Sequence, residues 1–179
     1  MSTNNSLRKN RCVIIIWILS LVILIFSILY FAERNKYSNQ SQKLEQTNLY
    51  LYELEVKSPL VILLNYLGAR PVEAVDWDEE VVSNDIQHIL RELDSGLTNI
   101  YNPALQNVPN DIQLQLHDLQ DKLYPILKNV YTEEPFDEQS KVAIMNLSEA
   151  VSVCDISEII IGWDQVKSKL ECMNAALVN

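Results

Sequence analysis

Residues 109–130 read PNDIQLQLHDLQDKLYPILKNV, and this stretch decides the fold class. Its aliphatic side chains recur every three or four positions, which places them on one face of an α-helix. Pro109 suits the start of a helix, and Pro125 predicts either a kink or a stop and restart. The stripe predicted to be buried consists of Ile112, Leu116, Leu119, Leu123, Ile126, Leu127 and Val130.

The same spacing predicts helices on both sides of this stretch. Before it, apolar residues follow helical steps over about 38–67 and again over about 76–102. After it, helices are predicted from 137 to the break at Gly162 and over about 165–177. The connections between these segments have ordinary lengths for neighbouring helices. An antiparallel bundle of four or five helices follows.

Residues that start or stop helices support these boundaries. Ser58-Pro59 predicts a kink or a fresh helix start, and Gly68 is a suitable C-cap. Gly162 offers a second stop, and Asp164 an N-cap for the last helix. The chain has only three glycines, which argues against folds built on many tight turns and against glycine-rich phosphate loops. The predicted fold class is therefore all-α.

An uncharged run precedes the bundle. Residues 12–32 read CVIIIWILSLVILIFSILYFA, and 21 residues at 1.5 Å each span a hydrocarbon core of roughly 30 Å. Trp17 at one end and Tyr30 and Phe31 at the other suit the membrane interfaces. The run is longer than the apolar part of a signal peptide, and Tyr30 disfavours cleavage after Ala32. The run therefore predicts an uncleaved, single-pass transmembrane helix.

Basic residues next to this run suggest its orientation. Arg8, Lys9 and Arg11 crowd the N-terminal flank without an opposing acidic residue, whereas the basic residues after the run are mixed with glutamates. We therefore predict a signal-anchor with its N-terminus in the cytoplasm and the bundle on the extracytoplasmic side of the cell membrane. The predicted segments are a cytoplasmic tail (1–11), the anchor (12–32), a juxtamembrane stalk (33–46) and an acidic helical domain (47–179).

The charge balance restricts the partners of that domain. The chain carries a net charge of −10, from 14 basic and 24 acidic residues. Three of the basic residues, Arg8, Lys9 and Arg11, precede the anchor. The part of the chain after the anchor therefore contains eleven basic and all twenty-four acidic residues. A domain of this charge repels nucleic acid and anionic lipid head groups. We expect no nucleic-acid partner.

Two cysteines of the domain are placed symmetrically about a predicted break. Residue 163 is the midpoint of Cys154 and Cys172, and it lies between Gly162 and Asp164. If two helices fold back there, the cysteines face each other closely enough for a disulfide. On one unbroken helix they would instead lie ~27 Å apart as separate thiols. An extracytoplasmic domain favours the disulfide, because that compartment is oxidising.

Residues for catalysis or metal binding are scarce. The only histidines, His88 and His117, do not form the Glu-x-x-His pairs of di-iron bundles, and no nucleophile, zinc-protease or nucleotide-binding motif is present. Cys154 and Cys172 have no histidine close in sequence, which makes a cysteine enzyme a weak third hypothesis. We expect neither an enzymatic activity nor a catalytic residue, cofactor or metal site.

Two tryptophans are candidates for partner contacts. Trp77 and Trp163 each follow a turn-like position and precede an aspartate. Each can hold the start of a helix against its neighbour, as a hydrophobic staple does. The alternative is an exposed aromatic side chain that anchors a protein partner.

Two functions remain open from the sequence. The first is a membrane-anchored helical module that binds a protein partner through a helix face. The second is an extracytoplasmic ligand-binding bundle that acts with a partner receptor. The plan of one anchor and one bundle is similar to that of the sensor modules of bacterial receptors, but only in architecture. A sensor also needs a second membrane helix or a cytoplasmic output domain, and here only an 11-residue tail precedes the anchor.

Overall fold

The structure of the chain is a computed structural model. It describes the backbone of residues 3–68, 70–100, 108–128, 130–131 and 135–177. Side chains are described within these ranges for residue 17 and from residue 19 onward, except for residue 100. The predicted interface residues Arg8, Lys9 and Arg11 therefore have side chains outside the described part.

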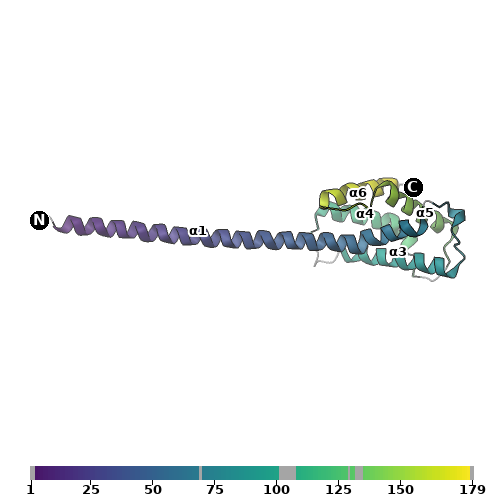
Figure 1. The fold of residues 1–179 in the computed structure, drawn as a ribbon, viewed down its shortest axis with the longest axis horizontal. Helices are drawn as coiled ribbons and strands as arrows, with labels where there is room; N and C mark the ends of the chain where they lie inside the picture. Colours follow the sequence, from purple (N-terminus) through teal and green to yellow (C-terminus); the bar gives the residue numbers. More distant parts are fainter. Residues whose placement is uncertain (1–2, 69, 101–107, 129, 132–134, 178–179) are drawn as a thin grey trace. The chain divides into compact units, whose positions relative to one another are not determined.

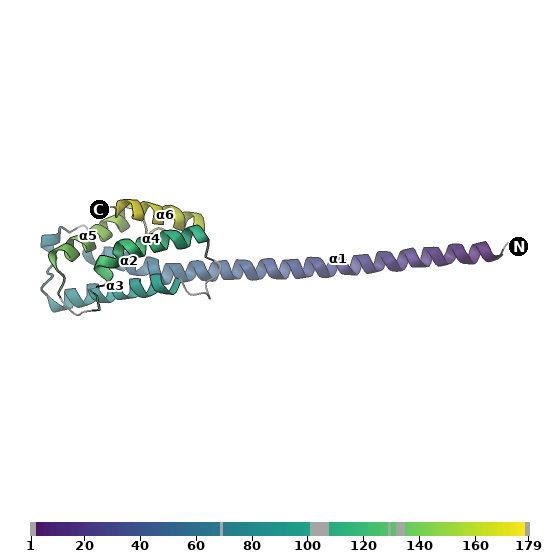
Figure 2. The ribbon, with the colours of Figure 1, turned by 180° about the vertical axis from the view of Figure 1, so that it is seen from behind.

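All regular secondary structure in the described residues is helical and they contain no strand, so the all-α prediction is confirmed. Figures 1 and 2 show the helices from both sides. The α-helices are α1 (Thr3–Tyr52), α2 (Ser58–Leu67), α3 (Glu80–Ile100), α4 (Asn110–Leu127), α5 (Glu138–Val153) and α6 (Trp163–Ala176). A π-helical turn, η1 (Glu53–Lys57), joins α1 to α2, and a short 3-10 helix, η2 (Val72–Ala74), follows α2.

The chain divides into two compact units, Met1–Leu44 and Glu45–Asn179. α1 contributes to both. In the first unit its large apolar side chains are exposed, among them Trp17 at 73%, Tyr30 at 63% and Phe31 at 61%. In the part of the chain that the structure describes, no helix combines the length and apolar character needed to cross a membrane.

The second unit is a helical bundle, as predicted. α3 runs antiparallel to η1 and α2, because Gly96 lies at Glu55 and Asp85 accepts a hydrogen bond from Tyr66. α4 in turn runs antiparallel to α3, because Gln120 donates to Thr98 near one end and Arg91 donates to the Val130 carbonyl near the other. The core of this unit is formed by the apolar faces of all these helices.

The stripe in residues 109–130 is the centre of the core. All seven of its members are buried, with at most 4% of any side chain exposed. α4 passes through Pro125 and ends at Leu127. Pro125 cannot donate to the Asp121 carbonyl, and because both residues are exposed, water can satisfy that carbonyl.

The last helix keeps the predicted antiparallel order. It folds back on α5, since Cys172 lies opposite Cys154 and Lys169 opposite Glu158, and it therefore runs in the same direction as α4. Lys167 pairs with Asp111 at 2.8 Å, and further along both helices Asn174 donates to the Gln115 carbonyl at 2.9 Å. The connector continues past the end of α5 to η1, where Lys57 donates to the Glu158 carbonyl, and α6 turns back from there.

α5 ends earlier than the sequence predicts, at Val153 and not at Gly162. Asp155 adopts a left-handed backbone conformation with φ of 51°. The Asp155 and Ile156 amides donate to the Ser152 and Val151 carbonyls, both at 3.2 Å. These are the two hydrogen bonds of a Schellman motif, and the buried pair Val151 and Ile156 provides its apolar contact. Sequence analysis missed this stop because glycine usually occupies the left-handed position.

Replacing Asp155 by glycine is expected to stabilise the bundle. A residue with a Cβ atom is strained at φ of 51°, and glycine is not. We expect Asp155→Gly to raise the free energy of unfolding by about 0.5–1 kcal/mol. Urea unfolding followed by tryptophan fluorescence measures this change. The control Ser152→Gly lies inside α5 and should lower stability by about 0.5 kcal/mol. Destabilisation by both variants would contradict the assignment of the motif.

The junction of α1 and α2 shows how Pro59 shapes the bundle. Pro59 has no amide hydrogen, so it cannot donate to the Glu55 carbonyl as an α-helix requires. The chain widens into the π-helical turn η1, in which the Ser58 amide donates to the Glu53 carbonyl. Gly96 of α3 lies directly against the Glu55 carbonyl, where a Cβ atom would be 1.9 Å from its oxygen. The absence of a side chain at Gly96 therefore allows the two helices to approach.

Candidate functional site

Cys154 and Cys172 form a disulfide in the structure. Their sulfur atoms are 2.00 Å apart and their Cα atoms 5.7 Å apart. The bond joins the C-cap of α5 to the middle of α6. The sequence symmetry paired these residues across two folded-back helices. In the structure they face each other in this way, with α6 packed mainly on α4 and its later part against the end of α5.

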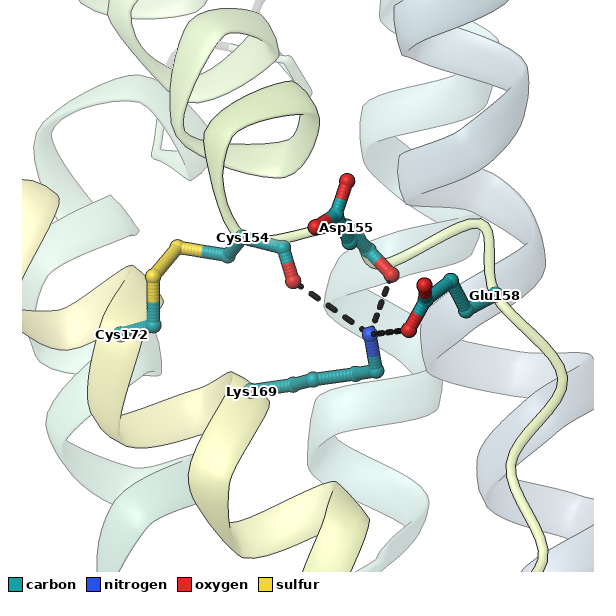
Figure 3. Close-up of a disulfide and its surroundings, with 5 residues drawn as sticks. All are labelled: Cys154, Asp155, Glu158, Lys169 and Cys172. Carbon is teal, nitrogen blue, oxygen red and sulfur yellow. Dashed lines mark hydrogen bonds and ion pairs between the residues drawn. A yellow bond between two sulfur atoms is a disulfide. The ribbon is translucent and has the colours of Figure 1, made fainter.

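The disulfide fixes one end of the connector, which comprises residues 154–162. The side chain of Lys169, from α6, extends to the first residues of the connector, as Figure 3 shows. The Lys169 Nζ atom donates to the Cys154 and Asp155 carbonyls and pairs with the Glu158 carboxylate at 3.0 Å. This lysine therefore supplies hydrogen bonds to carbonyls that the end of α5 leaves unpaired. Only 11% of its side chain is exposed.

A second lysine holds the connector from the opposite side. Lys57 of η1 donates to the Glu158 carbonyl at 2.6 Å and pairs with the Glu53 carboxylate at 3.3 Å. The buried side chains of Ile156 and Ile160 fix the connector to the core. The connector is thus attached to η1, α5 and α6 although it is not helical.

The connector exposes two large aliphatic side chains. Ile159 is 84% exposed and Ile161 is 82% exposed, the two highest values among the large apolar residues whose exposure the structure gives. Both flank the buried Ile160, as expected for an extended segment with alternating faces. Single exposed aliphatic residues are common on protein surfaces, but two on one restrained segment are a candidate contact site.

The two tryptophans proposed for partner contacts lie in the core. Trp77 and Trp163 are each only 8% exposed. Trp77 packs edge-on against Phe136, and its Nε1 atom donates to the Val72 carbonyl at 2.8 Å. Trp163 packs against Tyr52 with ring centroids 6.3 Å apart. Both rings therefore pack helix starts against neighbouring elements and leave little surface for a partner.

Three polar atoms near Trp163 are buried without a hydrogen-bond partner. They are Asn48 Nδ2, the Tyr52 hydroxyl oxygen and Trp163 Nε1. Asn48 and Tyr52 lie one turn apart on α1, and both face the core of the second unit. Burial, and secondly the negative charge of Glu53, raise the pKa of Tyr52 above its ordinary value.

Replacing Tyr52 by phenylalanine is expected to stabilise the bundle, most strongly at alkaline pH. At neutral pH the loss of an unpaired buried hydroxyl should raise the free energy of unfolding by about 1 kcal/mol. The raised pKa keeps Tyr52 neutral when folded, whereas the unfolded tyrosine ionises near pH ~10. The free energy of unfolding of the wild type therefore keeps its full value below that pH and falls above it as the unfolded tyrosine ionises, whereas that of Tyr52→Phe is free of this loss.

Urea unfolding at pH 8 and above pH ~10 tests this expectation. The difference between Tyr52→Phe and the wild type should grow with pH. Tyr50→Phe is the matched control, because Tyr50 lies on the same helix but is 61% exposed. If the free energies of unfolding of Tyr52→Phe and the wild type differ by the same amount at both pH values, the ionisation of Tyr52 is not coupled to unfolding as argued.

Several clefts indent the bundle, among them two with ample volume for a small molecule. The α2–α5 cleft has a volume of about 750 Å³ and lies between the end of α2, residues 70–72 and one face of α5. The α3 cleft has a volume of about 620 Å³ and lies along the first half of α3 beside Pro135. Arg91 lines the α3 cleft, but it already donates to Gln87 and to the Val130 carbonyl. The α2–α5 cleft holds charged residues without such partners.

The remaining candidate groups lie apart from one another. His88 is 3.5 Å from Glu92 and His117 is 3.8 Å from Asp121, both as exposed pairs one helical turn apart. Among the described residues, no cluster of three or more histidine, cysteine or acidic side chains could hold a metal ion.

Sequence analysis missed the two features that carry most of the binding potential. Ile159 and Ile161 fall inside the helix that the sequence predicts from 137 to Gly162, and so their extended conformation was not predicted. The run of three isoleucines before a glycine is the signal that could have identified an extended segment. Ser148 was missed because a serine within an apolar stripe looks like a tolerated core position.

No known protein family matches the chain, and comparison with curated proteins and with solved structures gives no match.

Proposed function

We propose that the chain is a single-pass membrane protein whose helical bundle is displayed on the extracytoplasmic side and binds a protein partner. The uncharged run at residues 12–32 supports the anchor, since its length matches the hydrocarbon core. Residues 12–16 and 18 of that run are outside the described side chains. Arg8, Lys9 and Arg11 support a cytoplasmic N-terminus.

The disulfide agrees with this orientation. Disulfides persist in oxidising compartments and are rare in the cytosol. The Cys154–Cys172 bond is thus consistent with a bundle outside the cytoplasm. The acidic charge of the bundle argues against a role at nucleic acid or at anionic membrane surfaces.

The observation that carries the partner-binding proposal is the exposed pair Ile159 and Ile161. Burying one isoleucine side chain contributes about 1.5–3 kcal/mol, so the pair could supply the apolar centre of a small interface. The disulfide, Lys57 and Lys169 already restrain the connector. Binding would therefore cost less conformational entropy than it would on a free loop.

Site-specific photo-crosslinking in the native membrane tests this contact. A photoreactive amino acid at Ser157, which is exposed beside the pair, should give one discrete adduct with another protein. Ile159→Ser/Ile161→Ser should abolish this adduct. The control Leu114→Ser removes an exposed aliphatic side chain from another surface, since Leu114 lies on α4 and is 68% exposed. It should leave the adduct unchanged. An adduct that persists in the double variant would exclude this surface.

A second candidate function is ligand binding in concert with a partner receptor. The α2–α5 cleft favours it, because its volume lies within the range of about 300–1,000 Å³ typical of small-molecule sites. Its lining combines apolar residues with a small number of polar and charged ones.

A further inference from the structure

The α2–α5 cleft contains a buried hydroxyl group without a partner. Ser148 of α5 lines the cleft and is only 1% exposed, and among the described residues no group forms a hydrogen bond with its Oγ atom. A helical serine often donates to the carbonyl four residues earlier, but this one does not. A buried hydroxyl without a partner is costly, so a ligand that reaches it recovers that cost on binding.

The cleft also holds one cation and one anion on different walls. Arg70 follows the end of α2, and Glu149 belongs to α5 next to Ser148. Both are exposed, and among the described residues neither makes a hydrogen bond or an ion pair. A ligand could therefore pair with both without displacing an existing interaction.

Apolar side chains complete the cleft. Leu64 and Val72 come from the α2 side, and Met145 and Val153 come from α5. Methionine is well suited to a ligand wall because its flexible side chain adapts to different apolar shapes. The cleft thus offers an apolar surface between two opposite charges.

We infer that the α2–α5 cleft binds a small zwitterion with apolar side chains, namely a short peptide with free termini. Arg70 pairs with its carboxylate, Glu149 with its ammonium group, and Ser148 donates to a peptide carbonyl. The strongly acidic domain repels a simple anion, whereas a zwitterion carries no net charge. This inference rests on the second candidate function, and it does not depend on the contact through Ile159 and Ile161.

Isothermal titration calorimetry on the full-length protein in detergent tests the inference. The probes are free-termini dipeptides of leucine, valine, methionine and phenylalanine, and the same dipeptides with acetyl and amide caps. We expect saturable binding of free dipeptides with a Kd below about 1 mM, as expected for ligands of this size. Capping should weaken binding by about 25-fold to 100-fold, because both charge pairs are lost. The absence of saturation by every free dipeptide overturns the inference.

Variants separate the roles of the three polar residues. Arg70→Ala and Glu149→Gln should each weaken dipeptide binding by about fivefold to tenfold. Lys128→Ala and Glu171→Gln, exposed changes of the same kind outside the cleft, should leave it unchanged. Ser148→Ala should weaken binding and yet raise the Tm of the free protein, because it removes an unpaired buried hydroxyl. Wild-type affinity in all three cleft variants also overturns the inference.

The same variants distinguish this site from the proposed partner contact. Ile159→Ser/Ile161→Ser should bind dipeptides like the wild type, while Arg70→Ala should retain the adduct formed from position 157. An adduct that persists in the isoleucine double variant would contradict the partner contact alone, and wild-type dipeptide binding in all three cleft variants would contradict the cleft alone. Loss of dipeptide binding in the isoleucine double variant would contradict the separation of the two sites.

Discussion

Gly96→Ala is expected to lower the free energy of unfolding by about 2–3 kcal/mol, although alanine is the better helix former by about 1 kcal/mol. The added Cβ atom would be 1.9 Å from the Glu55 carbonyl oxygen and 2.6 Å from its carbon. Both are backbone atoms of η1, so no side chain can rotate out of the way. The two helices must separate, and the core between them loses its packing.

Gly162→Ala is the matched control for this variant. Gly162 has a φ of −168°, which any residue adopts, and nothing lies within 4 Å of a Cβ atom added there. Urea unfolding of the full-length protein can be followed by the fluorescence of the buried Trp77 and Trp163. We expect Gly162→Ala to match the wild type. A Gly96→Ala protein as stable as that control would contradict the close approach of α3 and η1.

Removal of the disulfide is the second change with a large expected effect. The bond closes a loop with a sequence separation of 18 residues. For a loop of that length, the restriction of the unfolded chain is worth roughly 3 kcal/mol. We therefore expect Cys154→Ala/Cys172→Ala to lower the free energy of unfolding by about that amount. Cys12→Ala, in the apolar run, should leave the stability of the bundle unchanged.

Thiol titration provides the chemical check on this prediction. The chain has three cysteines, so the protein denatured without reductant should show one free thiol, from Cys12, and three after reduction. Purification must block thiols before lysis so that the bond is not formed afterwards. Three free thiols before reduction would show that Cys154 and Cys172 are not joined in the cell.

The parts of the fold that could be predicted are those determined by local spacing. The stripe in residues 109–130 places seven side chains in the core, and the structure buries all of them. Pro59 and Gly68 fall at the start and end of α2, where backbone chemistry leaves few alternatives. Such signals act within a few residues, so they can be read without knowledge of the tertiary structure.

The parts that could not be predicted depend on contacts between distant residues. Asp155 adopts the left-handed conformation that ends α5, and three long-range interactions support the turn: the disulfide, Lys169 and Lys57. No local pattern indicates that an aspartate will replace glycine there. The exposure of Ile159 and Ile161 follows from that turn. The candidate site was therefore missed for the same reason as the helix boundary.

Protease accessibility in intact cells tests the central proposal most directly. The full-length protein carries one epitope tag at the N-terminus and another at the C-terminus, and protease is added to the outside of unbroken cells. The proposal predicts loss of the C-terminal tag, with the N-terminal tag retained on a short fragment that alkaline carbonate does not extract from the membrane. Protection of both tags, or release of the untreated protein by carbonate, would contradict a membrane-anchored bundle displayed outside the cytoplasm.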